Sequence, residues 1–189
     1  MQGRSLSQQR AGLNAGQQTF AKLDQFPVPS IAALNGYTFG GGLELALACT
    51  FRVASANTKM GLPEVKLGLM PGYGGTQRLP RIVGQARAME LILTGRTITA
   101  EEALGMGLIN SLAGADALSA SIAFADQFSG HSKVAVSFAR QAVERALSAH
   151  LTEGLQVEAD LATLAFQTED ANEGMAAFVE KRPPQFKDR

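Results

Sequence analysis

An α/β fold with a helical C-terminal part is predicted by three features of the sequence. Two short apolar runs, residues 30–36 and 51–56, have the length and the turn boundaries of buried strands. A glycine triple, Gly40–Gly42, opens an apolar helical run between them. The remainder of the chain consists mostly of helical patterns. We therefore divide the chain into residues 1–84, a core with strands and motifs, and residues 85–189, a helical part.

The first helix is predicted over residues 5–25. Leu6, Leu13, Phe20 and Leu23 keep helical spacing among polar neighbours. Pro27 and Pro29 follow, and a helix cannot continue through them. Beyond the strand at 30–36, we expect a helix over 41–49, strands over 51–56 and 60–62, a loop or strand over 65–71, and a helix over 73–83.

The second half is predicted to be a succession of helices. ARAMELILTG forms a compact helix that stops at Gly95. Thr99 precedes the next helix as its N-cap, with Glu102 three residues later, which is the pattern of a capping box. After a brief extended piece, INSLAG, the expected helices are 115–128, 132–148, 151–168 and 170–181.

The composition excludes several classes of function. Seventeen basic residues balance seventeen acidic ones, so neither nucleic acid nor an anionic membrane surface would be attracted. Cys49 is the only cysteine, which excludes internal disulfides and CxxC metal sites. Residues 1–10 lack the apolar core of a secretory signal, and no apolar run reaches the length of a membrane span. We expect a cytoplasmic location, unless an upstream targeting segment, such as a mitochondrial one, directs the protein elsewhere.

Two glycine clusters suggest binding by the backbone. Glycines before a helix leave backbone N–H groups accessible, and the helix N-terminus adds partial positive charge. Gly40–Gly42 therefore suit an anion or a developing oxyanion; the alternative is close packing of helix on strand in a tight turn. Gly72, Gly74 and Gly75 follow Pro71 and pose the same choice between a donor site and a helix entry.

Two glutamates lie between these clusters. Glu44 stands in the apolar helical run LELALAC, where burial would raise its pKa toward the range useful for acid/base catalysis. Its alternative role is a first-turn acid that interacts with the helix dipole. Glu64 follows a proline in GLPE and has a surface turn as its alternative. As a pair flanked by glycine turns, the two carboxylates suggest acid/base chemistry beside an oxyanion site.

Other polar residues are weaker candidates. Arg78 and Arg81 suit phosphate, but we expect them to be solvated or ion-paired. His131 and His150 lie near predicted helix ends without a nucleophile motif, and we expect caps or surface residues. The Gly-x-Ser-x-Gly, HExxH and Walker patterns do not occur, so the sequence offers no serine-hydrolase, zinc-protease or P-loop signature.

The motifs together resemble one family. NGYTFGGGLELALACTFRVAS, followed by GLPEVKLGLMPGYGGTQRLPRIVG, is similar to the enoyl-CoA hydratase/isomerase (crotonase) family, above all to short-chain enoyl-CoA hydratases. The likeness extends through LTGRTITAEEALGMGLIN to the tail EGMAAFVEKRPPQFKDR. It implies a crotonase-like spiral of ββα units, with a helical C-terminal part that assembles homotrimers or homohexamers. It also implies hydration of a 2-enoyl-CoA to a 3-hydroxyacyl-CoA, as in fatty acid β-oxidation, without metal or redox cofactor, since coenzyme A belongs to the substrate.

The resemblance assigns roles to individual residues. Glu44 and Glu64 match the catalytic acid/base pair, and Gly41 matches a donor of the oxyanion hole. Lys181 matches a coenzyme A contact offered to a neighbouring subunit, although a solvated tail lysine is an equal alternative. The implied substrate-binding positions are Gly40, Pro71, Gly72 and Lys181.

The sequence departs from the family pattern at its beginning. Family members have a further segment there, with the first ββ units, the second oxyanion donor and an A-x-G-x-D loop. Loss of one donor typically costs roughly 10²–10³-fold in kcat, so we expect this chain to be weakly active or inactive. The lost strands would also expose a sheet edge. Alternatives to short-chain hydration are isomerisation, hydration of branched enoyl-CoA, and a non-catalytic fragment with only an assembly role.

Overall fold

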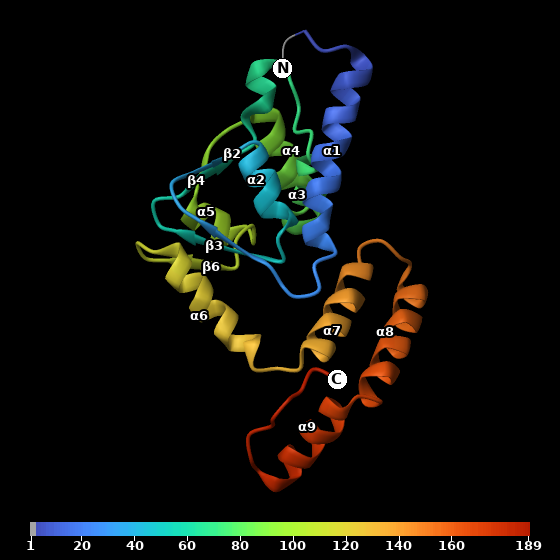
Figure 1. Ribbon diagram of the computed structural model, residues 1–189. Helices are drawn as coiled ribbons and strands as arrows, with labels where there is room; N and C mark the ends of the chain where they lie inside the picture. The colour runs from blue at the N-terminus through green and yellow to red at the C-terminus, as the bar shows by residue number, and fades with distance from the viewer. Residues whose placement is uncertain (1–2) are drawn as a thin grey trace. The chain divides into compact units, whose positions relative to one another are not determined.

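The computed structural model describes residues 3–189. Their contacts divide the chain into two compact units, which meet in sequence between Phe124 and Ala125 (Figure 1). Gly84 lies between two helices of the first unit. The sequence predicted a different boundary, at residue 84, between a core that carries the motifs and a helical part that assembles the oligomer. That division stays a prediction.

The elements alternate between strands and helices in the first unit and are helical in the second. In chain order they are α1 (Leu6–Asp24), β1 (Ile31–Leu34), β2 (Tyr37–Phe39), α2 (Gly41–Ala48), β3 (Phe51–Ser55), β4 (Lys59–Gly61), the 3-10 helix η1 (Pro63–Leu67), α3 (Gly75–Val83), α4 (Gln85–Thr94), β5 (Ile98–Thr99), α5 (Ala100–Gly105), β6 (Ser111–Ala113), α6 (Ala117–Ser129), α7 (Lys133–Arg145), α8 (Leu151–Phe166) and α9 (Glu169–Glu180).

Within the described residues, the strands form two three-stranded sheets, with the orders β1-β3-β6 and β2-β4-β5. β1 runs parallel to β3, with Ile31 opposite Phe51, and β2 runs parallel to β4, with Tyr37 opposite Lys59. The segments β1–β2–α2 and β3–β4–η1 therefore repeat the same path, one strand to each sheet and then a helix. This repetition is the predicted spiral of ββα units.

Several local predictions were incomplete or wrong. β2 and β5 were not predicted, because three- and two-residue strands are defined by their partners in the sheet rather than by a pattern of their own. The segment 65–71 is not a strand: η1 occupies its beginning and ends at Gly68, whose φ of 69° is left-handed. The predicted capping box is half formed. Thr99 accepts the N–H of Glu102, but the Glu102 carboxylate pairs with Arg96 at 2.5 Å instead of bonding back.

The core of the first unit fixes α2 against the sheets. Leu43 from α2 packs in one cluster with Met60 from β4, Leu79 from α3 and Ile98 from β5, each at most 2% exposed. Burial of such a side chain contributes about 1.5–3 kcal/mol. Three other elements therefore determine the position of α2 and of the residues at its N-terminus.

A buried cation supports the other end of α2. Arg52 is only 6% exposed, and burial lowers the pKa of its guanidinium. It donates to the carbonyl oxygens of Cys49 at 2.8 Å and Leu108 at 2.7 Å, and more weakly to that of Ala46. A cation is favourable where helix carbonyls lack partners. Arg52 thus connects the C-terminus of α2 to the turn after α5.

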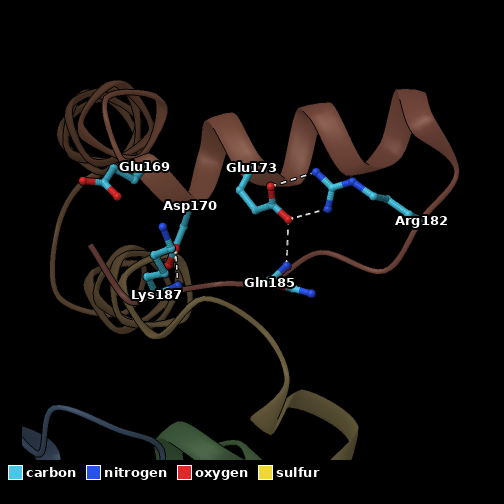
Figure 2. A pocket seen from close by; sticks show the side chains of 6 residues that line it. All are labelled: Glu169, Asp170, Glu173, Arg182, Gln185 and Lys187. Atoms are coloured by element: carbon cyan, nitrogen blue, oxygen red, sulfur yellow. Dashed lines mark hydrogen bonds and ion pairs between the residues drawn. The ribbon is translucent and has the colours of Figure 1, made fainter.

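The second unit is helical, as predicted, and its tail is attached by carboxylates. Asp170, at the start of α9, accepts the N–H groups of Lys187 and Asp188 at 2.7 and 3.0 Å. Glu173 binds Arg182 through both carboxylate oxygens and also accepts the N–H of Gln185, as Figure 2 shows. The last residues are therefore ordered against α9.

Candidate active site

Glu44 is buried and held in one orientation. It lies in the first turn of α2 and is 1% exposed, which confirms the burial expected from its apolar neighbours. Its Oε1 accepts the backbone N–H groups of Tyr73 and Gly75, both at 2.8 Å. These donors belong to the second glycine cluster. The structure therefore connects the two glycine turns through a single carboxylate oxygen.

Glu64 is held differently. It lies in the first turn of η1, and its Oε2 is inaccessible to solvent without a hydrogen-bond partner among residues 3–189. Burial raises the pKa of Glu64; its own backbone N–H opposes the rise, and the charge of Glu44 adds to it. The two carboxylates are therefore near enough to influence each other, and their role as an acid/base pair stays a prediction. An unpaired buried carboxylate oxygen is also rare in proteins and points to a functional role.

The first glycine turn lies beside Glu64. Gly40 has a φ of 55°, and a Cβ atom built on it would lie 3.1 Å from Oε1 of Glu64. Its N–H is occupied by the carbonyl oxygen of Gly61 at 3.0 Å. Gly41 begins α2, where the first N–H groups have no partner within the helix. The backbone donor available at this turn is therefore that of Gly41, not that of Gly40.

The second glycine turn is packed closely against Glu44 and α1. A Cβ atom built on Gly75 would lie 3.1 Å from Oε1 of Glu44, so a side chain there would displace the carboxylate. Pro71 is buried. The carbonyl oxygen of Gly72 accepts Nε2 of Gln17 at 2.9 Å, and a Cβ atom on Gly72 would lie 2.7 Å from Cδ2 of Leu13. Both sides of this turn are thus fixed.

Of the remaining candidate residues, the two arginines have other partners, and the histidines and Lys181 belong to the second unit. Arg78 pairs with Asp24 at 2.5 Å, and Arg81 donates to the carbonyl oxygen of Gln77, which agrees with the expectation of ion-paired or solvated arginines. His131 and His150 are exposed. Lys181 is an exposed residue with a left-handed φ of 54° at the end of α9, in the second unit. Its coenzyme A contact stays a prediction.

Sequence reasoning missed the partners of Glu44. The N–H groups of Tyr73 and Gly75 are 29 and 31 residues away from it in the chain. The glycine cluster itself was a usable signal, because glycines that precede a helix expose donors. The sequence could not show that Oε1 of Glu44 is the acceptor of these two N–H groups.

Comparisons with known proteins identify the family and the fold of the chain. The family model described as enoyl-CoA hydratase/isomerase matches residues 1–189. The chain belongs to the enoyl-CoA hydratase/isomerase family. It is 49% identical over 172 residues to the probable enoyl-CoA hydratase echA8 of Mycobacterium bovis, a match that covers 90% of this chain and 67% of the relative.

Other members of the enoyl-CoA hydratase/isomerase family extend the agreement. The crotonyl-CoA hydratase of Syntrophomonas wolfei is 40% identical over 187 residues, which cover 98% of this chain and 72% of that protein. The crystal structure of an enoyl-CoA hydratase from Bacillus anthracis superposes with a TM-score of 0.94 at 39% identity, over 99% of this chain and 73% of that one. This chain thus spans about two thirds to three quarters of the length of these relatives. The crotonase-like fold predicted from the motifs is confirmed.

The described residues also bear on metal binding and membrane spanning. In the part of the chain that the structure describes, no three His, Cys, Asp or Glu side chains are grouped as metal ligands. Over the same residues, no helix combines the length and the apolar character that crossing a membrane requires.

A polar cavity of about 450 Å³ in the second unit is lined by Glu173, Arg182 and Lys187 among others (Figure 2). Glu173 and Arg182 bind each other there, so we assign no ligand to it.

Proposed function

We propose that this chain adds water across the 2,3 double bond of a 2-enoyl-CoA to give a 3-hydroxyacyl-CoA. The observation that carries the proposal is the pair of unlike carboxylates, Glu44 and Glu64, beside a glycine turn whose Gly41 N–H has no partner within α2. Membership of the hydratase/isomerase family and the names of relatives at 40–49% identity support it.

Gly41 is the proposed oxyanion donor. The thioester carbonyl oxygen would accept its N–H at the N-terminus of α2, where the partial positive charge of the helix favours a negative oxygen. Charge that develops on this oxygen as the enolate forms would thus be stabilised. Such a donor typically contributes roughly 10²–10³-fold to kcat. Gly40, Pro71 and Gly72 form the proposed walls on either side.

The carboxylates take complementary roles in the proposal. Glu44, fixed by two backbone N–H groups, orients a water molecule through its other oxygen and accepts the proton that this water loses. The hydroxyl group bonds to C3. Glu64, whose raised pKa favours the protonated form, delivers a proton to C2. One water is consumed, and both of its hydrogens are accounted for once the proton on Glu44 has returned to Glu64 through solvent.

Hydration of crotonyl-CoA by the 189-residue chain tests the proposal. Loss of the enoyl-thioester absorbance is followed for the unchanged chain, Glu44→Gln, Glu64→Gln and the control Glu158→Gln, which changes an exposed glutamate on α8. We expect both site variants to lose about 10²–10⁴-fold in kcat and the control to lose nothing. Activity that survives both site substitutions would overturn the mechanism. A shifted double bond rather than 3-hydroxybutyryl-CoA as the product would favour isomerisation.

Assembly, cofactor use and location are also proposed. Large apolar side chains are exposed on the helices of the second unit, including Val143, Leu151, Phe178 and Val179 at 72–85% exposure. Surfaces of this kind are typical of protein interfaces, and we propose a homotrimer or homohexamer that covers them. The mechanism uses acid/base and backbone groups, so it requires no metal or redox cofactor. A single cysteine suits a reducing compartment, and we propose the cytoplasm.

A further inference from the structure

One face of α1 packs along the turn that holds Glu44. Leu13, Gln17 and Phe20 each contact this turn, residues 71–75. Asp24 extends the same face and pairs with Arg78, whose Nη1 donates to the carbonyl oxygen of Tyr73 at 3.1 Å. Positions 13, 17, 20 and 24 are three or four residues apart and share one side of a helix. α1 is thus arranged to hold the turn.

Tyr73 is the centre of these contacts. Its ring meets Phe20 edge to face, with centroids 5.6 Å apart and planes at 65°. A Cβ atom built on Gly16 would lie 2.3 Å from Cε1 of Tyr73, so the ring fits only because position 16 has no side chain. On its other side, the ring lies 3.6 Å from where a Cβ atom of Gly41 would be. The ring therefore occupies the space between α1 and the start of α2.

The backbone of Tyr73 reaches the chemistry directly. Its N–H is one of the two donors to Oε1 of Glu44. A shift of the ring moves the backbone to which it is attached, and with it the N–H that orients the carboxylate. Misplacement of a catalytic group by about 1 Å can cost roughly 10²-fold in rate.

We propose that Tyr73 is a positioning residue for Glu44, and that Gly16 and Phe20 of α1 form the seat that holds its ring. The expected effect on kcat rests on the proposed hydratase function. The packing of the Tyr73 ring against Gly16 and Phe20 does not depend on that function. The hydroxyl group of Tyr73 has no role in it, so the ring alone should suffice.

The test is Gly16→Ala, with Gly12→Ala as the matched control. Both changes place alanine in α1, where alanine is favoured over glycine by roughly 0.8–1 kcal/mol, so neither should weaken the helix. Among residues 3–189, a Cβ atom on Gly12 meets only the end of the Arg4 side chain, at 3.1 Å, whereas one on Gly16 meets the ring. We expect Gly16→Ala to lower kcat for crotonyl-CoA about 10-fold to 10²-fold with KM changed less than about 3-fold. Gly12→Ala should match the unchanged chain.

Two further variants separate positioning from general damage. Tyr73→Phe should keep full kcat, because it keeps the ring. Tyr73→Ala should lose activity, and Gly16→Ala combined with Tyr73→Ala should be no worse than Tyr73→Ala alone, because the added methyl group then has no ring to displace. Independent, multiplying losses in the double variant would overturn the proposal.

Amide hydrogen exchange gives a readout that does not depend on activity. In Gly16→Ala, the N–H groups of Tyr73 and Gly75 should exchange about 10-fold faster than in Gly12→Ala, because their bonds to Glu44 are weakened. Equal exchange in the two variants would overturn the positioning role, even if the chain proved inactive on crotonyl-CoA. An inactive chain with the expected exchange difference would show that this chain alone does not hydrate crotonyl-CoA, as expected if a second oxyanion donor is lacking, and would leave the seat of Tyr73 established.

Discussion

Glu44 and Glu64 are the same residue type in the same site, but the protein treats them in opposite ways. Oε1 of Glu44 receives two backbone N–H groups at 2.8 Å each. Oε2 of Glu64 is buried with no hydrogen-bond partner in the described part of the chain, and burial raises the pKa of this carboxyl. The fold thus stabilises the ionised form of Glu44 by hydrogen bonds and destabilises the ionised form of Glu64 by burial. A carboxyl group with a raised pKa stays protonated to a higher pH, so Glu64 is the group that holds a proton for delivery to a substrate.

Truncation of each side chain should show this difference in stability. Glu44→Ala leaves two largely buried N–H groups unpaired, and each costs about 1–3 kcal/mol, so we expect a total loss of about 2–6 kcal/mol. Glu64→Ala removes an oxygen that has no partner, and we expect a change within about 1 kcal/mol. Both tyrosines, Tyr37 and Tyr73, lie in the first unit, so tyrosine fluorescence during urea unfolding reports on that unit.

A control fixes the interpretation of the Glu44 result. Glu44→Gln keeps an oxygen that can accept both N–H groups, so it should lose much less stability than Glu44→Ala while it still loses catalysis. If Glu44→Ala and Glu64→Ala proved equally destabilising, the contrast between a supported and an unsupported carboxylate would be wrong.

Sequence reasoning predicted the burial of Glu44 but not the surroundings of Glu64. The apolar neighbours Leu43 and Leu45 predicted that Glu44 lies in an apolar helix, and its burial is confirmed. The strands β1 and β3 were predicted because turn residues bound apolar runs. In contrast, the donors to Glu44 and the isolation of Glu64 depend on contacts between segments distant in the chain. Local patterns carry no information on such contacts, just as β2 exists only through its pairing with β4.

The glycine turn beside Glu64 offers a second comparison, between Gly40→Ala and Gly36→Ala. Both glycines have positive φ values, 55° and 65°, so alanine should be destabilising at either position. Gly40 also has a ψ of −127°, outside the left-handed helical region, so the loss of stability should be larger there. Only at Gly40 does the new Cβ atom meet Oε1 of Glu64, at 3.1 Å; at Gly36 it meets nothing within 4 Å. We expect a loss of unfolding free energy in both variants, larger in Gly40→Ala, but a loss of kcat for Gly40→Ala alone. Equal activities in the two variants would show that the position of Glu64 is not set by this turn.

The smallest expected effect is the pH dependence that Glu64 gives to stability. Its pKa in the folded protein is raised by burial above the ordinary value, so the folded state binds more protons in the range between the two values. Stability should therefore fall as the pH rises through that range, and Glu64→Gln should remove this fall.

The carboxylates that hold the tail act with the opposite sign: Arg182 lowers the pKa of Glu173 to about 2, so its contribution is present above the ordinary pKa and is lost as the pH falls. Subtraction of the Glu64→Gln curve from that of the unchanged chain, both measured by urea unfolding at a series of pH values, cancels the tail. A difference that is constant with pH would mean that Glu64 titrates normally, and the assignment of Glu64 as the proton donor would then lose its physical basis.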